Sequence, residues 1–166
     1  MKIEKLSKEH KRSSFDCGNE YLNSYLKTQA SQDARHHVAT TFVAAEEEGV
    51  VAGFYTICAT GLHREVLPAD TERRLPKYRI IPAILLGRLA VALGCQGTGL
   101  GGRLLINAFE RCSNINVAWA FLVTDAKDEP ARAFYSHYGF FSLEDDVNHL
   151  CLPRKTVNEA VNERSR

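Results

Sequence analysis

The sequence predicts a mixed α/β sheet, and three observations support this fold class. Two segments rich in β-branched and aromatic residues, 38–45 and 50–60, flank the acidic turn 46–49, which is typical of a β-hairpin. A long apolar segment, 81–93, leads into a glycine-rich turn and directly into an amphipathic helix pattern. Helix and strand patterns then alternate, so strands and helices are expected to share one core.

The N-terminal part of the chain predicts one helix. Asn19 is placed to accept the hydrogen bonds of the first helical turn. The apolar residues Leu22, Tyr25, Leu26 and Ala30 recur at helical spacing. We therefore expect a helix that begins after Asn19.

Two segments of different character lie between the hairpin and the glycine-rich turn. Residues 63–79 hold Pro68, Pro76 and many charges, which indicates a long surface connection. Residues 81–93 are apolar on both faces and include a single charged residue, Arg88, so they predict a centrally buried strand.

The C-terminal half predicts two helices and three strands. The first helix follows the glycine-rich turn and extends to about Cys112. The second is capped by Asp128, tolerates Pro130 in its first turn and ends at Gly139. The strands are expected at residues 117–123, 140–143 and 149–152.

The length of 166 residues fits one domain. We expect a single domain over residues 1–153. The segment 154–166 is polar and is expected to be a frayed or loosely docked tail.

The composition excludes several classes of protein. Hydrophobic residues make up 45% of the chain and charged residues 25%, so wholesale disorder is excluded. The net charge of +1 provides no strong overall field, so a nucleic-acid or membrane partner would need a local patch. The charged start predicts no secretory signal, and no apolar segment is long enough to span a bilayer. The five cysteines lack CxxC spacing and no HExxH motif occurs, so we expect reduced thiols in a cytoplasmic protein without a metal site.

The segment 96–102, Q-G-T-G-L-G-G, is the sharpest local signal for chemistry. Glycines allow a close backbone approach to a ligand, and the helix start that follows supplies free N–H groups suited to a phosphate. The alternative is a glycine-rich turn that binds nothing. Gly97, Gly99 and Gly102 also satisfy the dinucleotide fingerprint, but too few residues follow for a doubly wound nucleotide-binding fold.

An aromatic stripe on the helix after Asp128 is the second signal. Ala131, Phe134, Tyr135 and Tyr138 share one helical face. Packing explains this stripe if the tyrosines bury their rings and hydrogen-bond their hydroxyls. A functional role, with one hydroxyl facing a cleft between two central strands, explains it equally well, so the spacing leaves both interpretations open.

Basic residues are concentrated between positions 64 and 88. They are Arg64, Arg73, Arg74, Lys77, Arg79 and Arg88, against the acidic residues Glu65, Asp70 and Glu72. This local excess of positive charge indicates either a phosphate-binding surface or an ordinary solvated loop.

Several of these motifs together resemble the GCN5-related N-acetyltransferase (GNAT) family. The shared motifs are R-L-A-V at 88–91, Q-G-T-G-L-G at 96–101 and A-x-x-F-Y-x-x-Y-G-F at 131–140. Four further blocks resemble, more narrowly, the acetyltransferase toxins of bacterial toxin–antitoxin pairs: F-D-C-G-N-E-Y-L at 15–22, P-A-I-L-L-G-R-L-A-V at 82–91, D-A-K-D-E at 125–129 and L-C-L-P at 150–153.

The resemblance implies an α/β (α+β) fold of the GNAT type. Its central sheet would be mixed, mostly antiparallel and twisted, with six to seven strands and about four flanking helices. A splayed strand pair would form the acyl-CoA cleft.

The resemblance also implies a site for acetyl-CoA as co-substrate. Strand backbone groups would contact the pantetheine arm, the glycine-rich turn would hold the pyrophosphate, and Tyr135 would be the general acid. Asp128 falls where the family often has Asn near the pantetheine, and helix capping is its other explanation. The expected acetyl-CoA-binding residues are Leu89, Ala90, Val91, Gln96, Gly97, Thr98, Gly99, Leu100, Gly101, Gly102 and Asp128.

The implied activity is N-acetylation of a primary amine, namely the amino group of aminoacyl-tRNA, by a toxin that inhibits translation. The implied partners are the tRNA, contacted through Arg35, Lys77, Arg79 and Arg88, a ribbon-helix-helix antitoxin and a second copy in a homodimer. Acetylation of a small amine or a protein N-terminus, and a non-catalytic CoA-binding regulator, remain alternatives.

Overall fold

The computed structural model describes residues 1–166, and its strands and helices follow one another broadly as the sequence predicts. The strands are β1 (Lys2–Lys5), β2 (Thr40–Ala45), β3 (Val51–His63), β4 (Ile80–Val91), β5 (Phe121–Asp125), β6 (Phe141–Ser142) and β7 (His149–Pro153). The α-helices are α1 (Glu20–Ser24), α2 (Ala30–Arg35), α3 (Ala69–Glu72), α4 (Leu100–Ser113), α5 (Glu129–His137) and α6 (Arg154–Arg164). A π-helical turn, Tyr25–Gln29, joins α1 to α2, and 3₁₀ turns lie at Arg64–Val66 and Leu93–Cys95.

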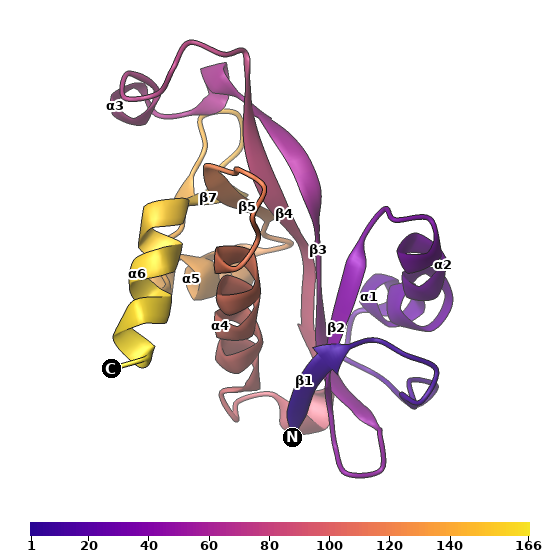
Figure 1. Cartoon of the computed structure of the whole chain (residues 1–166). Coiled ribbons are helices and arrows are strands. Elements are labelled where there is room, and N and C mark those ends of the chain that lie inside the picture. Colours follow the sequence, from indigo (N-terminus) through magenta and orange to yellow (C-terminus); the bar gives the residue numbers. More distant parts are fainter. The chain divides into compact units, whose positions relative to one another are not determined.

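The seven strands form one sheet in the order β1-β2-β3-β4-β5-β7-β6 (Figure 1). The pair β4–β5 is parallel, whereas β1–β2, β2–β3, β5–β7 and β6–β7 are antiparallel. This mixed, mostly antiparallel sheet confirms the expected fold class. The chain forms two compact units, one of residues 1–58 and 86–108 and the other of residues 59–85 and 109–166.

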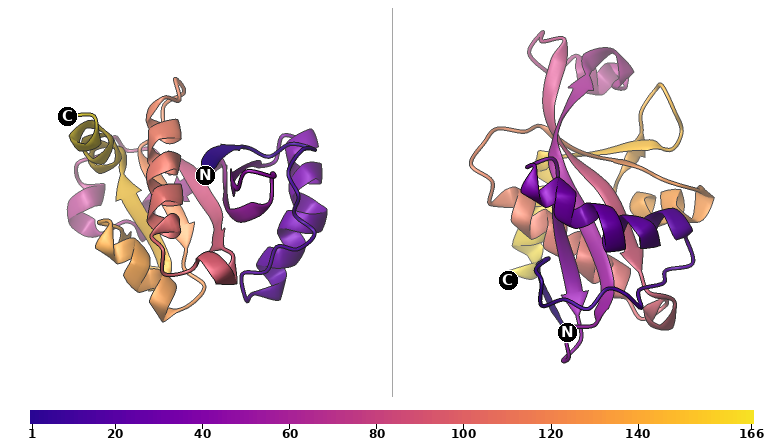
Figure 2. Two further views of the ribbon diagram at one scale, coloured as in Figure 1. Left: turned by 90° about the horizontal axis from the view of Figure 1, so that it is seen from below. Right: turned by 90° about the vertical axis from the view of Figure 1, so that its right-hand side faces the viewer.

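In the first unit, the helical segment α1–α2 packs on the hairpin β2–β3. The Asn19 side chain accepts a hydrogen bond from the Leu22 N–H at 3.1 Å, which confirms the expected cap. The apolar face of this segment shares a buried cluster with residues of β2 and β3, and Figure 2 shows the segment crossing one face of these strands. The buried members from both sides include Leu22, Tyr25, Leu26, Ala30, Val43, Val51 and Phe54.

In the second unit, strand β5 begins later than the sequence predicts. It starts at Phe121, not at Val117, whose side chain is 75% exposed. The residues between them form a loop in which Trp119 is buried and donates its indole N–H to the Cys112 carbonyl at 3.2 Å. The apolar character of this loop therefore reflects one buried indole and not a strand.

Helix α5 lies where the sequence places it. The Asp128 carboxylate accepts a hydrogen bond from the Ala131 N–H at 2.9 Å, and Pro130 lies in the first turn. The helix ends before Gly139, which has a φ of +96° in the left-handed region. Both boundaries are confirmed.

The segment expected to be a frayed tail is instead helix α6, which follows β7 directly (Figure 1). Val157 is fully buried, and the Arg154 guanidinium carbon lies 4.7 Å from the centroid of the Trp119 ring. These contacts stabilise a helix whose remaining residues are mostly polar. No helix in the structure combines the length and the apolar character that crossing a membrane requires.

Candidate active site

The turn between β4 and α4 has the backbone geometry expected of a phosphate cradle. Gly97 and Gly99 have φ values of +77° and +84°, which favour glycine over any residue with a Cβ. A Cβ built on either glycine meets no atom within 4 Å. The turn therefore borders open space, and a side chain there would occupy it.

Helix α4 adds free donors beside this turn. The N–H of Arg103 donates to the Gly99 carbonyl at 3.1 Å, as expected for an i→i−4 bond at the start of the helix. The N–H groups of Leu100, Gly101 and Gly102 precede that bond and have no intrahelical acceptor. Together with the positive end of the helix dipole, they suit an anion such as a pyrophosphate.

Two side chains of the motif hold the turn in place. The Gln96 amide nitrogen donates to the carbonyls of Cys17 (3.1 Å) and Val91 (3.0 Å). The Thr98 hydroxyl donates to the Cys95 carbonyl at 2.6 Å. The Gln96 and Thr98 side chains thus fix the loop conformation, which leaves binding to the backbone of the glycines.

Strand β4 continues towards the turn beyond the residues that pair with β5. Its parallel register with β5 runs from Ala83 opposite Phe121 to Leu85 opposite Val123, and β4 extends to Val91. Ala90 is buried in the first unit's core, whereas Leu89 and Val91 are half-buried. Any contact of Ala90 with a pantetheine arm would therefore come from its backbone.

Tyr135, the predicted general acid, lies in the second unit on α5. Its side chain is buried, and its ring packs edge-on against Phe134 and Phe140 at centroid distances of 5.2 and 5.3 Å. Burial raises the pKa of Tyr135 to about 12, and a hydrogen bond with the Thr124 side chain opposes this rise. The phenol is therefore fully protonated at neutral pH, as a proton donor must be.

Thr124 is a residue that the sequence analysis did not single out. It lies on β5 one residue before the strand's last residue, and it is buried. A hydroxyl side chain directly after the apolar residues 121–123 of this strand was the available signal, because a buried hydroxyl needs a hydrogen-bond partner.

The four residues of the expected tRNA-contacting set lie in different environments. Lys77 and Arg79 are exposed on one segment of the second unit, and Arg35 is exposed at the end of α2 in the first unit. Arg88 is half-buried in the first unit, with its guanidinium carbon 3.5 Å from the centroid of the Tyr25 ring. It also donates a hydrogen bond to the Tyr21 hydroxyl at 3.0 Å. Arg88 is thus held by two tyrosines and is not a free surface charge.

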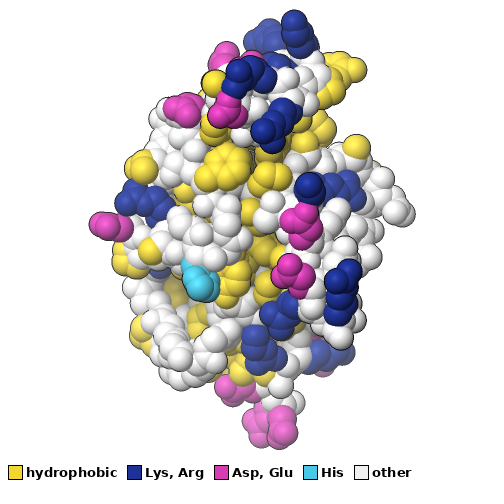
Figure 3. All heavy atoms as spheres, turned by 90° about the vertical axis from the view of Figure 1, so that its left-hand side faces the viewer, with side chains coloured by type: hydrophobic (Ala, Val, Ile, Leu, Met, Phe, Trp, Pro, Cys, Tyr) yellow, Lys and Arg dark blue, Asp and Glu magenta, His cyan; other side chains and the backbone are white.

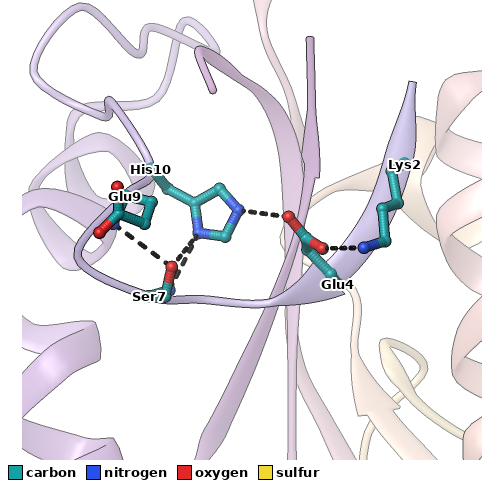
Figure 4. Close-up of polar contacts among 5 residues, drawn as sticks. All are labelled: Lys2, Glu4, Ser7, Glu9 and His10. Carbon is teal, nitrogen blue, oxygen red and sulfur yellow. Dashed lines mark hydrogen bonds and ion pairs between the residues drawn. The ribbon is translucent and has the colours of Figure 1, made fainter. Parts of the chain in front are cut away.

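A serine, a histidine and a glutamate lie together near the N-terminus, but they do not form a hydrolytic site (Figure 4). The His10 Nδ1 atom accepts a hydrogen bond from the Ser7 backbone N–H at 2.9 Å, and the Ser7 hydroxyl lies 3.3 Å from the same atom. The shorter backbone bond therefore occupies the lone pair that a base for the hydroxyl would use. The other ring nitrogen lies 3.1 Å from the carboxylate of Glu4, which also pairs with Lys2. The group links β1 to the turn that follows it.

The chain offers no cluster of three or more His, Cys, Asp or Glu side chains that could hold a metal ion. The five cysteines form no disulfide. Burial raises the pKa of both the Cys112 and the Cys151 thiols to about 12, so neither is an activated nucleophile.

Comparison with known proteins agrees with this geometry. Residues 37–141 match the family model described as an acetyltransferase (GNAT) domain. The chain is 32% identical over 150 residues to a tRNA-acetylating toxin of Mycobacterium tuberculosis (strain ATCC 25618 / H37Rv). This alignment covers 89% of each of the two chains. It also matches the structure of AtaT complexed with acetyl-methionyl-tRNAfMet, with a TM-score of 0.87 and 30% identity over 95% of this chain and 97% of that one.

A third match is a mutant of the AtaT toxin bound to the C-terminus of the antitoxin AtaR and to acetyl-CoA. Its TM-score is 0.78, with 27% identity over 95% of this chain and 96% of that one. The glycine-rich turn and the helix start after β4 lie within the matched domain. The chain belongs to the GNAT acetyltransferase family.

Proposed function

We propose that this protein transfers the acetyl group of acetyl-CoA to the amino group of an aminoacyl-tRNA and so acts as a toxin that blocks translation. The observation that carries the proposal is the 32% identity to a tRNA-acetylating toxin along 89% of both chains. The fold-level match to AtaT complexed with acetyl-methionyl-tRNAfMet supports the same substrate class.

The residues of the first unit fit the co-substrate. Gly97 and Gly99 leave room for phosphate groups, and the first N–H groups of α4 supply donors for them. The backbone of Leu89 and Val91 would contact the pantetheine arm. Bound there, acetyl-CoA supplies an activated acyl group, so the protein needs no nucleophile of its own.

Tyr135 would assist departure of the thiol. The substrate nitrogen attacks the thioester carbonyl carbon, the carbon–sulfur bond breaks, and the sulfur takes the Tyr135 phenol proton as its negative charge develops. The attacking nitrogen loses a proton to solvent, and the Tyr135 phenolate regains one from solvent, which restores the general acid. An α-amino group has an unperturbed pKa of ~7.7–8.0, so a useful fraction is neutral near physiological pH without a dedicated base.

The proposal includes a protein partner. AtaT binds the C-terminus of its antitoxin AtaR, and we propose a ribbon-helix-helix antitoxin for this protein too. Both would act in the cytoplasm, where aminoacyl-tRNA is used. A homodimer is part of the same proposal.

The decisive experiment measures transfer of radiolabelled acetyl from acetyl-CoA to purified aminoacyl-tRNAs, with the deacylated tRNAs as controls. We expect label in at least one aminoacyl-tRNA and none in its deacylated form. Labelling of small amines or peptide N-termini alone would assign a different acetyltransferase substrate. Tight acetyl-CoA binding without turnover on any amine would favour the non-catalytic regulator.

A further inference from the structure

The segment that joins α3 to β4, residues 73–80, has an unusual combination of exposed side chains, and we call it the Tyr78 loop. It lies in the second unit beside α3, where Figure 3 shows Lys and Arg side chains gathered at the top of the view, with acidic and hydrophobic side chains among them. Every residue from Pro76 to Ile80 is exposed, as are Arg73 and Arg74.

Arg64 holds the backbone that leads into and through this loop. Its guanidinium donates to the Glu72 carboxylate at 2.8 Å, to the Glu72 carbonyl at 3.0 Å and to the Pro76 carbonyl. Its backbone N–H donates to the Arg79 carbonyl at 3.0 Å. The loop is therefore internally braced, which lowers the entropy that a ligand must remove on binding.

Some basic residues of this region form ion pairs with acidic side chains, and others do not. Arg64 pairs with Glu72, and Arg73 pairs with Asp70. Arg74, Lys77 and Arg79 form no ion pair, so the loop presents three uncompensated cations within six residues.

Tyr78 stands among these cations without a partner of its own. Tyr78 is 69% exposed, and its ring and hydroxyl make no aromatic contact or hydrogen bond that would give it a structural role. Ile80, which follows Arg79, is also exposed. An exposed aromatic ring flanked by free cations matches the chemistry of a single-stranded nucleic acid, whose bases stack and whose phosphates are anionic.

We propose that the Tyr78 loop binds the tRNA substrate, with Tyr78 stacked on an unpaired base and Arg74, Lys77 and Arg79 in contact with phosphates. This inference rests on the proposed function, because it assigns a surface to the same substrate. It places part of tRNA recognition on a short, braced loop that the acetyl-CoA cradle does not include.

The test measures the affinity of fluorescently labelled, uncharged tRNA by anisotropy, because this readout does not depend on turnover. Tyr78→Ala should raise Kd about 5- to 150-fold, which corresponds to the loss of one base–aromatic stack. Tyr78→Phe keeps the ring and should change Kd by less than about twofold. On a blunt RNA duplex, which offers no unpaired base, Tyr78→Ala should bind as the wild type does.

A salt series separates the stacking role from the charge role. Between about 50 and 200 mM salt, Lys77→Gln should reduce the slope of log Kd against log salt by about one phosphate contact, whereas Tyr78→Ala should leave the slope unchanged. The matched control is Lys155→Gln on α6, an exposed lysine outside the loop, which should leave affinity and slope unchanged.

A gain-of-signal variant provides a second measurement. The chain has one tryptophan, the buried Trp119, so Tyr78→Trp adds an exposed indole whose fluorescence tRNA should quench. Wild-type tRNA affinity in Tyr78→Ala, or an equal loss on tRNA and duplex, would overturn the proposal while the proposed function stands. Normal tRNA affinity with lost antitoxin binding would assign the loop to the protein partner and overturn it as well. If the wild-type protein neither binds nor acetylates tRNA, the proposed function itself is wrong.

Discussion

The Arg88 guanidinium carbon lies 3.5 Å from the centroid of the Tyr25 ring, a close cation–π contact within the first unit. Tyr25 is itself fixed, because it is buried and its hydroxyl donates to the Asp33 carboxylate at 2.8 Å. The Arg88 Nε atom is buried and has no hydrogen-bond partner. The ring face therefore supplies much of what holds this cation on β4.

We expect Arg88→Met to destabilise the fold by about 1 kcal/mol, because it removes the cation–π contact and the bond to Tyr21. This corresponds to a fall in Tm of about 2–4 °C for a chain of this size. Arg79→Met, at an exposed position, should leave Tm nearly unchanged. Calorimetry of both variants checks this, and equal Tm values for the two would mean that the contact contributes no stability.

Acetyl-CoA should stabilise the protein against heat, whereas NAD and NADP should not. The open turn at Gly97 and Gly99 and the free N–H groups of α4 suit a pyrophosphate, and too few residues follow the turn for the doubly wound fold that binds NAD. A ligand at ~100 Kd adds about 2.7 kcal/mol to the free energy of unfolding, which a melting curve resolves easily. A shift with NAD and none with acetyl-CoA would assign the cradle to a different ligand.

Elements specified by local signals were predicted well from the sequence. The caps at Asn19 and Asp128 and the stop at Gly139 each depend on one side chain and its immediate neighbours. The glycine-rich turn is likewise local, because its positive φ values need only glycine at two positions. These features define where helices begin and end, and where the chain turns between β4 and α4.

Features that depend on distant contacts were missed. Helix α6 has only a short apolar stripe, Val157, Ala160 and Val161, of which Val157 alone is buried, and Arg154 packed on Trp119 adds to its stability. The late start of β5 also depends on Trp119, which packs at the end of α4. The partnership of Thr124 and Tyr135 joins a strand to a helix, so neither residue's neighbours in sequence reveal it.

Substitutions at Gly99 test the cradle directly. Gly99→Glu should abolish acetyl-CoA binding, since its side chain would fill the open space and its charge would repel the phosphates at the helix start. Gly99→Gln is the matched control for backbone strain, because both side chains meet the same φ of +84°.

Both variants should lose a similar amount of stability, whereas the acetyl-CoA affinity of Gly99→Glu should be the lower. Calorimetry gives the ligand affinity and the Tm of each variant. Normal acetyl-CoA binding by a folded Gly99→Glu protein would mean that the cradle lies elsewhere.

Tyr135→Phe removes one hydroxyl and keeps the ring that packs against Phe140. If Tyr135 is the general acid, kcat should fall by ~10²–10⁴-fold with acetyl-CoA affinity unchanged. A purely structural tyrosine would show the opposite result, a loss of about 1 kcal/mol in stability with kcat nearly intact. Tyr138→Phe, at the C-cap of the same helix, is the internal control, and loss of activity there with full activity in Tyr135→Phe would contradict the assignment.

The pH dependence of the reaction tests the state of the Tyr135 phenol. A general acid must be protonated, and burial raises the pKa of Tyr135 to about 12. The active form therefore persists to higher pH than for an ordinary phenol, whose pKa is ~10. The stability of the fold depends on pH in the same direction. The neutral Tyr135 phenol makes its full contribution to the free energy of unfolding below pH ~10, and this contribution is lost as the pH rises through about 12.

We expect kcat/KM to rise between pH ~6 and ~9 as the substrate α-amino group loses its proton, and then to stay level to pH ~10. Single-turnover measurements, corrected for hydrolysis of the aminoacyl ester, would record this profile. Tyr135→Phe should keep the rise at low pH, because that limb belongs to the substrate amine. A fall of kcat/KM near pH 9–10 in the wild type that disappears in Tyr135→Phe would contradict this prediction. It would mean that the Tyr135 phenol has an ordinary pKa and is exposed to solvent during the reaction, and so is not a buried proton donor.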